Sequence, residues 1–150
     1  MLLALRASYL CGSSFEWGEH TGYAHQAGLS LDEINRVAGT GDLSGWAPAE
    51  AVLLRAADEL CADCAISEDT WAELTSHFDA PALIEVPFIV GQYTMLSMVA
   101  NALGVPSSPG APLRPLNHDN VYRVVHVASD DLHDRIVSDE AMATFAPVVA

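Results

Sequence analysis

Apolar residues recur every three or four positions along most of this chain, and short polar or glycine-containing stretches separate them into blocks. That spacing is the period of an α-helix, because residues three and four apart lie on one helix face. Alternating apolar and polar runs are too short to predict a strand. The pattern therefore predicts an all-α protein, with more than half of its residues in helices and no sheet of three or more strands.

Capping residues divide the first third of the chain into three predicted helices. The first covers residues 1–11 and ends at Gly12. The second covers residues 14–27 and is closed by Gly28, since glycine commonly follows the last helical residue. Ser30 is placed to cap a short third helix that extends to residue 38, with acidic side chains in its favourable first turn.

Three longer helices are predicted after a loop over residues 39–45. Pro48 opens a helix over residues 49–63, Ser67 caps one over residues 68–77, and Asp79 caps one over residues 80–103. Pro87 lies inside the last of these and should kink or split it, because proline removes one backbone hydrogen bond. Residues 104–115 are rich in proline and predict a linker.

The second predicted helix carries the side chains best suited to chemistry. Glu16 and His20 are four residues apart, about 40° around a helix and one turn apart on the same face. Tyr23 falls on the same stripe. An acid/base site is one interpretation, and an ordinary surface pair worth about 0.3 kcal/mol is the other.

The residues around this pair resemble the carboxymuconolactone decarboxylase/alkylhydroperoxidase D (AhpD) superfamily over about residues 2–106. The resemblance is distributed over many positions, and no single motif carries it. It is carried by Leu5-Arg6-Ala7, Cys11-Gly12-Ser13, Phe15-Glu16-Trp17-Gly18-Glu19-His20, Ala27-Gly28-Leu29-Ser30, Asp32-Glu33-Ile34, Trp46-Ala47-Pro48, Leu54-Arg55-Ala56-Ala57-Asp58-Glu59-Leu60, residues 67–71, Gly91-Gln92-Tyr93 and residues 98–104.

The resemblance favours the decarboxylase type over the peroxidase type. Peroxidase members carry Cys-x-x-Cys four residues before the histidine, and those two positions are Ser13 and Glu16 here. Thiol–disulfide chemistry needs a thiolate and a resolving thiol, which serine and glutamate cannot supply. This chain therefore has the Glu-x-x-x-His pattern.

The resemblance implies an AhpD-like helical bundle that is shortened at its N-terminus and extended by a C-terminal tail. We expect a helical domain over residues 1–106, followed by a linker and an extension over residues 107–150 that packs on it. Many relatives have a glutamate just before the Leu2-Leu3 pair, which peroxidase members use in a proton relay, and this chain has Met1 there. The resemblance also implies a homo-oligomer, a trimer or a multiple of one, with a dimer as the alternative.

The implied activity is proton transfer without a cofactor, on a small organic acid, lactone or related carbonyl compound. A decarboxylation or isomerisation needs a proton donor near the developing carbanion and an apolar pocket. We expect His20 to be the general acid/base and Glu16 to orient it or share its proton. Plausible substrate contacts are aromatic, although each could equally be core: Trp17, Tyr23, Trp46 and Tyr93.

Two other functions remain open at this point. One is a non-catalytic family member that serves as a binding or assembly module, since the relay glutamate is absent. The other is peroxidase activity through Cys11 or through the Cys61/Cys64 pair. We expect all three cysteines to be packing residues instead, because helical cysteines are usually small buried hydrophobes and a metal site would need further ligands.

Charge and composition restrict the partners. With 20 acidic and 6 basic residues, the net charge of −14 argues against nucleic acid and anionic membranes. No apolar run approaches the ~20 residues of a membrane span, and residues 1–10 lack a basic leader typical of a signal peptide. An odd number of cysteines suggests a reducing cytoplasm. The 51% hydrophobic content suggests buried subunit interfaces.

The tail over residues 117–150 contains apolar clusters that need a partner surface. We expect at least one helix there to pack against the first two helices. His126, Asp130, His133 and Asp134 would share a face if residues 121–137 are helical, and such side chains can bind zinc. A solvated face is the default interpretation, so no metal site is predicted.

Overall fold

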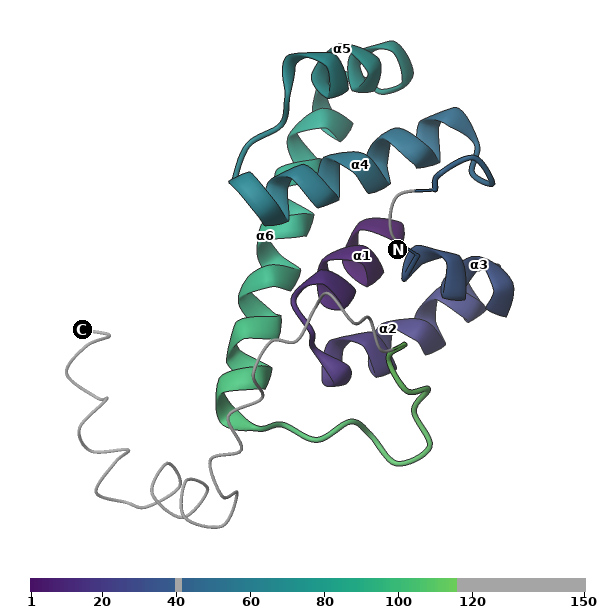
Figure 1. Cartoon of the computed structure of the whole chain (residues 1–150), viewed down its shortest axis with the longest axis vertical. Coiled ribbons are helices and arrows are strands. Elements are labelled where there is room, and N and C mark those ends of the chain that lie inside the picture. The colour runs from purple at the N-terminus through teal and green to yellow at the C-terminus, as the bar shows by residue number, and fades with distance from the viewer. Residues whose placement is uncertain (40–41, 116–150) are drawn as a thin grey trace, which may run out of the picture.

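The computed structural model describes residues 1–39 and 42–115, and within them it contains helices and no strand (Figure 1). The predicted all-α class is therefore confirmed. The helices are α1 (Leu2–Leu10), α2 (Ser14–Gln26), α3 (Leu31–Val37), α4 (Pro48–Asp63), α5 (Glu68–His77) and α6 (Ala80–Leu103).

The helix boundaries lie close to the predicted positions, and local hydrogen bonds fix them. The Ser13 hydroxyl accepts a hydrogen bond from the Glu16 backbone N–H at 3.3 Å, which fixes the start of α2. Ser30 and Glu33 form a reciprocal capping box at α3. Gly28 has φ +101°, the left-handed conformation that glycine adopts without steric cost after a helix end. These local hydrogen bonds explain why the boundaries could be predicted from the sequence.

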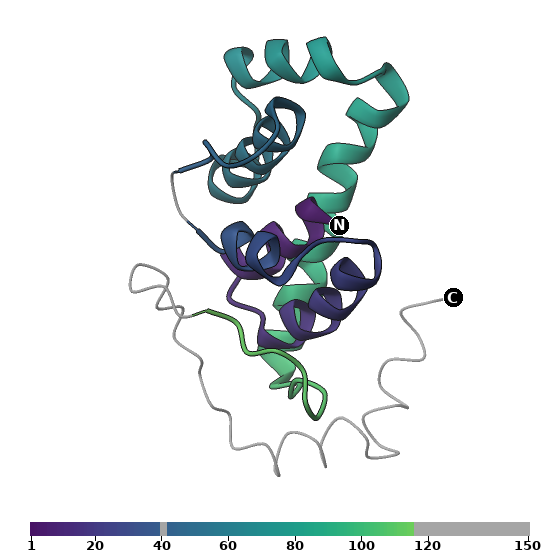
Figure 2. The same cartoon turned by 90° about the vertical axis from the view of Figure 1, so that its right-hand side faces the viewer.

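Helix α1 lies at the centre of the bundle, between α4 and α6 on one side and α2 and α3 on the other (Figures 1 and 2). Every residue from 3 to 9 is buried. Two apolar clusters share this helix. One joins α1 to α4, α5 and α6 through Leu3, Ala7, Val52, Ala56, Ala57, Leu74, Leu83, Val86 and Val90. The other joins α1 to α2, α3 and α4 through Leu5, Tyr9, Trp17, Ala24, Ile34, Val37, Ala38, Trp46 and Leu54.

Arg6 is the one charged side chain within the buried length of α1. Its guanidinium binds both carboxylate oxygens of Asp58, at 2.5 and 2.9 Å, and so joins α1 to α4. The same group donates to the carbonyl of Val37 at 2.6 Å and to that of Gly39 at 2.5 Å, at the end of α3. Arg6 therefore satisfies its own buried charge and fixes three helices relative to one another.

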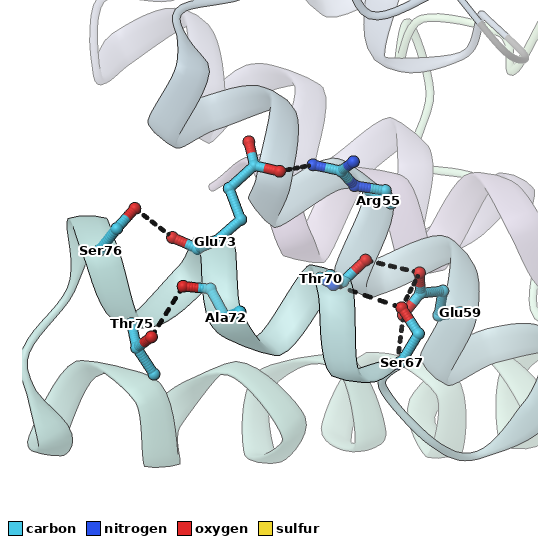
Figure 3. A network of polar contacts seen from close by, with 8 residues as sticks. All are labelled: Arg55, Glu59, Ser67, Thr70, Ala72, Glu73, Thr75 and Ser76. Carbon is cyan, nitrogen blue, oxygen red and sulfur yellow. Dashed lines mark hydrogen bonds and ion pairs between the residues drawn. The ribbon is translucent and has the colours of Figure 1, made fainter.

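A polar network joins α4 to α5 (Figure 3). The Glu59 carboxylate accepts hydrogen bonds from the Ser67 backbone N–H at 2.7 Å and from the Thr70 hydroxyl at 2.6 Å. Arg55, one turn earlier on α4, forms an ion pair with Glu73. A carboxylate at the N-terminus of α5 is also favoured by the helix dipole, so this network holds α5 against α4.

Helix α6 extends along the whole bundle from α5 to the linker (Figure 1). It continues through Pro87, so the proline does not split it. With 24 residues and a mean hydropathy of 1.4 in its most apolar part, α6 is long and apolar enough to cross a membrane, by length and composition only. The expectation that no apolar run approaches that limit is therefore wrong for α6, in which Glu85 is the one charged residue.

One side of α6 packs against α1, α2, α4 and α5, and the other side carries exposed apolar residues. That exposed side, which we call the α6 stripe, consists of Ile84, Phe88, Met95, Met98, Val99 and Leu103. The absence of a membrane partner stays a prediction. A stripe of this kind, on a helix that also forms the core, is typical of a contact with another protein surface.

After Gly104 the chain runs beside α2 without regular secondary structure (Figure 1). A Cβ atom added to Gly18 would lie 2.9 Å from the Ala111 Cβ atom, so the linker approaches α2 closely at that glycine. The predicted helix and the candidate metal ligands of residues 117–150 lie outside the described residues.

Candidate acid/base site

Glu16 and His20 lie one turn apart on the face of α2 that is turned toward α6. Neither side chain projects into bulk solvent: the Glu16 side chain is 8% exposed and the His20 side chain is 15% exposed. An ordinary surface pair would leave both groups solvated, so the burial of this pair favours the acid/base interpretation.

The two side chains approach through one imidazole nitrogen. Nε2 of His20 lies 3.4 Å from a carboxylate oxygen of Glu16. This distance is within the range of an ion pair and slightly longer than a normal hydrogen bond. The other nitrogen, Nδ1, is buried and has no hydrogen-bond partner among the described residues. A buried polar atom without a partner is costly in a folded protein, so such an atom is a candidate for binding a ligand.

Burial lowers the pKa of His20 below its ordinary value of 6.5, and the nearby Glu16 carboxylate opposes this shift. The imidazole is therefore neutral at pH 7. In the tautomer that places a proton on Nε2, facing Glu16, the lone pair is on Nδ1. In this arrangement the Nδ1 lone pair has no partner among the described residues and could accept a proton.

Two tyrosines surround the imidazole. The Tyr93 ring, from α6, contacts His20 edge-on with 4.6 Å between ring centroids. The Tyr23 ring, one turn further along α2, lies 5.6 Å from His20 and is 54% exposed. Burial, and secondarily the charge of Glu16, raises the pKa of Tyr93, which keeps its hydroxyl protonated and able to donate a hydrogen bond.

Trp17 and Trp46 are not grouped with His20. Trp17 is 1% exposed and packs against Tyr9 at 5.8 Å between centroids, on the side of α2 that faces α1. Trp46 belongs to the same apolar cluster and lies under the Arg36 guanidinium at 4.9 Å. Both rings belong to the apolar core, so we leave them out of the proposed site. Of the four predicted substrate contacts, Tyr23 and Tyr93 lie beside the histidine.

Ser13, at the first of the two peroxidase cysteine positions, is fully buried and engaged in capping α2. Glu16, at the second, faces His20. Among the described residues no group of three or more histidine, cysteine or acidic side chains is placed to hold a metal ion. The four metal-ligand candidates of the tail lie outside this part of the chain.

Two features of the site region were not predicted from the sequence. The first is the contact between the linker and Gly18, which lies on the other side of α2 from the Glu16–His20 pair. The sequence feature that could have indicated this contact is the pair Gly18 and Gly22. Glycine inside a helix lowers its stability, so two of them four residues apart suggest a close approach by another segment. The second is the set of contacts that Arg6 makes with α4 and with the end of α3. The sequence feature that could have indicated it is a single charged residue within an apolar helix.

Comparisons with known proteins support the fold and nothing finer. No protein-family model matches this chain, and no curated protein matches it. A crystal structure of a protein of unknown function from Agrobacterium tumefaciens, with a suggested role as the antioxidant defence protein AhpD, is similar with a TM-score of 0.64. The two sequences are 21% identical, and the match covers 77% of this chain and 76% of the other. The fold is therefore AhpD-like.

Proposed function

We propose that this protein is a cofactor-independent acid/base enzyme that moves a proton at a carbon atom next to a carbonyl group. The observation that carries the proposal is the asymmetry of His20, whose Nε2 faces Glu16 while its buried Nδ1 has no partner among the described residues. A general base needs a lone pair that is free of protein contacts and within reach of the substrate.

In the proposed reaction Nδ1 of His20 accepts a proton from the carbon and later returns one. Glu16 stabilises the imidazolium that forms between these steps, as a carboxylate partner does for other catalytic histidines. The Tyr93 hydroxyl is protonated and can donate a hydrogen bond to the negative oxygen of the enolate. A decarboxylation takes no proton from carbon, so there His20 would first take a proton from water and then give it to the carbanion that remains after CO2 leaves.

The charges around His20 favour a substrate that is neutral at the reacting end, such as a lactone or a ketone. Glu16 is acidic, and among the described residues no arginine has a recorded contact with His20 or Glu16. Arg6 binds Asp58, Arg55 pairs with Glu73, Arg36 stacks on Trp46 and Arg114 lies over Tyr9. A carboxylate substrate without a cationic partner would be repelled by Glu16.

The experiment that tests this proposal is exchange of substrate hydrogen for deuterium in D2O, followed by proton NMR over a panel of small lactones, ketones and β-keto acids. Loss of the signal at the carbon next to the carbonyl of a lactone or a ketone is the expected result, and β-keto acids should react more slowly because of their charge. His20→Gln should reduce the rate by 10²-fold or more, the usual contribution of a general base.

His25→Gln is the matched control, because His25 lies on the same helix and is exposed. It should keep the wild-type rate. Equal rates in His20→Gln and the wild type would refute the proposal and leave the binding-module alternative. Cytoplasmic location and the absence of a nucleic-acid partner stay predictions from the sequence.

A further inference from the structure

Arg114, in the linker that follows α6, is a half-buried cation with unpartnered hydrogen-bond donors. Its Nε and Nη1 atoms are shielded from solvent, and neither has a hydrogen-bond partner among the described residues. An arginine cannot lose this charge by deprotonation, unlike a buried histidine or lysine. Buried N–H groups and a buried charge both destabilise a fold unless they are compensated. The side chain therefore calls for an anion.

The other arginines of the described residues each have their charge compensated. Arg6 and Arg55 are paired with carboxylates on other helices or turns of the bundle. Arg55 also has an unpartnered Nε, but its ion pair balances the charge. Arg36 is exposed, so water solvates it. Within the described part of the chain, Arg114 alone combines shielded donors with the lack of a carboxylate partner.

The guanidinium of Arg114 lies against an aromatic ring. Its Cζ atom is 5.6 Å from the centroid of the Tyr9 ring. Tyr9 is itself only 2% exposed and packs on Trp17, so the ring is a fixed part of the core. A cation–π contact attracts the guanidinium but offers no oxygen to accept its N–H groups. Tyr9 therefore positions Arg114 and leaves the edges of the guanidinium available to another group.

The linker reaches this position by lying directly on α2. A Cβ atom added to Gly18 would be 2.9 Å from the Ala111 Cβ atom and 3.8 Å from the Pro112 carbonyl oxygen. This contact is just ahead of Arg114 in the sequence, and it lies on the other side of α2 from the Glu16–His20 pair. Arg114 is therefore not a part of the acid/base site.

We propose that Arg114 binds a carboxylate group at a site formed by its guanidinium and the Tyr9 ring. A planar carboxylate fits one edge of a guanidinium with two parallel N–H···O bonds, as Asp58 does with Nε and Nη2 of Arg6. At Arg114 each edge likewise joins one shielded nitrogen to Nη2, so one carboxylate would compensate the charge and satisfy a shielded donor.

A carboxylate suits this site better than a phosphate group does. One guanidinium balances the single negative charge of a carboxylate. A phosphate group carries about −1.5 to −2 charges at pH 7 and would bring uncompensated charge to a chain whose net charge is already −14. The proposed site does not rest on the acid/base proposal.

The same chemistry is available from two sources. One is a free small organic acid. The other is an acidic side chain of residues 116–150, which contain six and follow Arg114 directly in the sequence. The experiment is designed to separate the two.

The test follows the arginine Nε–Hε signals of the full-length protein by NMR while sodium acetate is added, with sodium chloride at equal ionic strength as the reference. Arg114→Gln assigns the signal. A free organic acid as the natural ligand predicts a saturable shift of the Arg114 signal with acetate and none with chloride. Arg36 is the matched control, since it also lies over an aromatic ring but is exposed. Its signal should respond equally to both salts.

A carboxylate from residues 116–150 predicts a different result. Acetate then leaves the Arg114 signal unchanged, and the Arg114 Hε exchanges with water about tenfold or more slowly than that of Arg36. The signal should also move when carboxylates become protonated near about pH 4. Changing the six acidic side chains to amides should make the Arg114 signal responsive to acetate.

The sign of a stability change gives a second readout that holds for both sources. Arg114→Gln, measured in acetate buffer, should lower Tm, because a compensated charge and its hydrogen bonds are lost. Arg36→Gln should leave Tm nearly unchanged. If the Arg114 cation has no anion, removal of a buried charge should instead raise Tm. A raised or unchanged Tm, or an Arg114 signal that behaves like that of Arg36 toward acetate, pH and exchange, would overturn the proposal.

Discussion

The imidazole of His20 uses one nitrogen to approach Glu16 and leaves the other without a partner among the described residues. Nε2 lies 3.4 Å from the Glu16 carboxylate, and Nδ1 is buried. In a plain ion pair on a helix surface both nitrogens would be solvated. Here the Glu16 carboxylate lies at one end of the ring and the other end is buried. The pKa of His20 therefore depends on both the burial of the ring and the charge of Glu16.

The first prediction is that His20 titrates below its ordinary pKa of 6.5, because burial disfavours the charged imidazole. Glu16→Gln should lower the pKa further, since the Glu16 carboxylate raises it in the wild type. The measurement is an NMR titration of the histidine ring protons, with His20→Gln used to assign the signal. A wild-type midpoint above 6.5 would contradict the burial argument.

A second prediction concerns stability against pH. Because the pKa of His20 is lower in the folded state, the unfolded state binds more protons between that value and pH 6.5. The free energy of unfolding should therefore fall as the pH decreases through 6.5, and it should level off below the folded pKa. Urea unfolding at pH 7.5 and 5.5 measures this, and His20→Gln should show a smaller difference between the two.

The third prediction uses the two glycines of α2 as a matched pair. Gly22→Ala should stabilise the protein by about 0.5–1 kcal/mol, because alanine favours helix and an added Cβ meets nothing within 4 Å. Gly18→Ala gains the same helix propensity, yet its Cβ would lie 2.9 Å from that of Ala111. Gly18→Ala should therefore be neutral or destabilising. Thermal unfolding of both variants measures the difference in stability. Equal stabilisation would mean that the linker moves freely from α2.

A fourth prediction separates the buried arginine from an exposed one. Arg6→Met should destabilise the protein by about 3 kcal/mol, because it removes the buried guanidinium that pairs with the partly exposed Asp58 and leaves the Val37 and Gly39 carbonyls without their donor. Arg55→Met breaks a partly exposed pair with Glu73 and should change stability by less than about 1 kcal/mol. Chemical denaturation of the two variants is the measurement, and similar losses would contradict the difference in burial.

The fifth prediction is that the α6 stripe is a contact between copies of this chain. Phe88 is 74% exposed, and Ile84 and Met95 share its side of the helix at spacings of four and seven residues. We expect a homo-oligomer at micromolar concentration, a trimer or its multiple, or a dimer. Multi-angle light scattering should give a lower molar mass for Phe88→Asp than for the wild type.

Leu113→Asp is the control for that experiment, since Leu113 is equally apolar and 88% exposed on the linker. It should keep the oligomeric state of the wild type. A wild-type monomer, or an unchanged oligomer in folded Phe88→Asp, would show that the α6 stripe has another role.

The sequence by itself determined the helices and the candidate residues of the site. Ser13, Ser30, Ser67 and Asp79 begin helices at the predicted positions because capping is a hydrogen bond within three residues of the chain. The approach of Glu16 and His20 could be predicted for a similar reason, since four residues along a helix fix their separation. The AhpD-like fold was predicted from a resemblance spread over about two thirds of the chain, and the structure agrees with it.

Only the tertiary structure decided which residues far apart in the sequence meet. It assigned Trp17 and Trp46 to the core and Tyr93 to His20, and it placed the Cys61 sulfur 3.8 Å from the Thr94 hydroxyl oxygen of α6. It also showed that one side of α6 is unpacked, which its uniformly apolar sequence does not reveal. The physical reason is that periodicity determines which face of a helix is apolar, whereas burial, pKa and contact depend on which other helix covers that face.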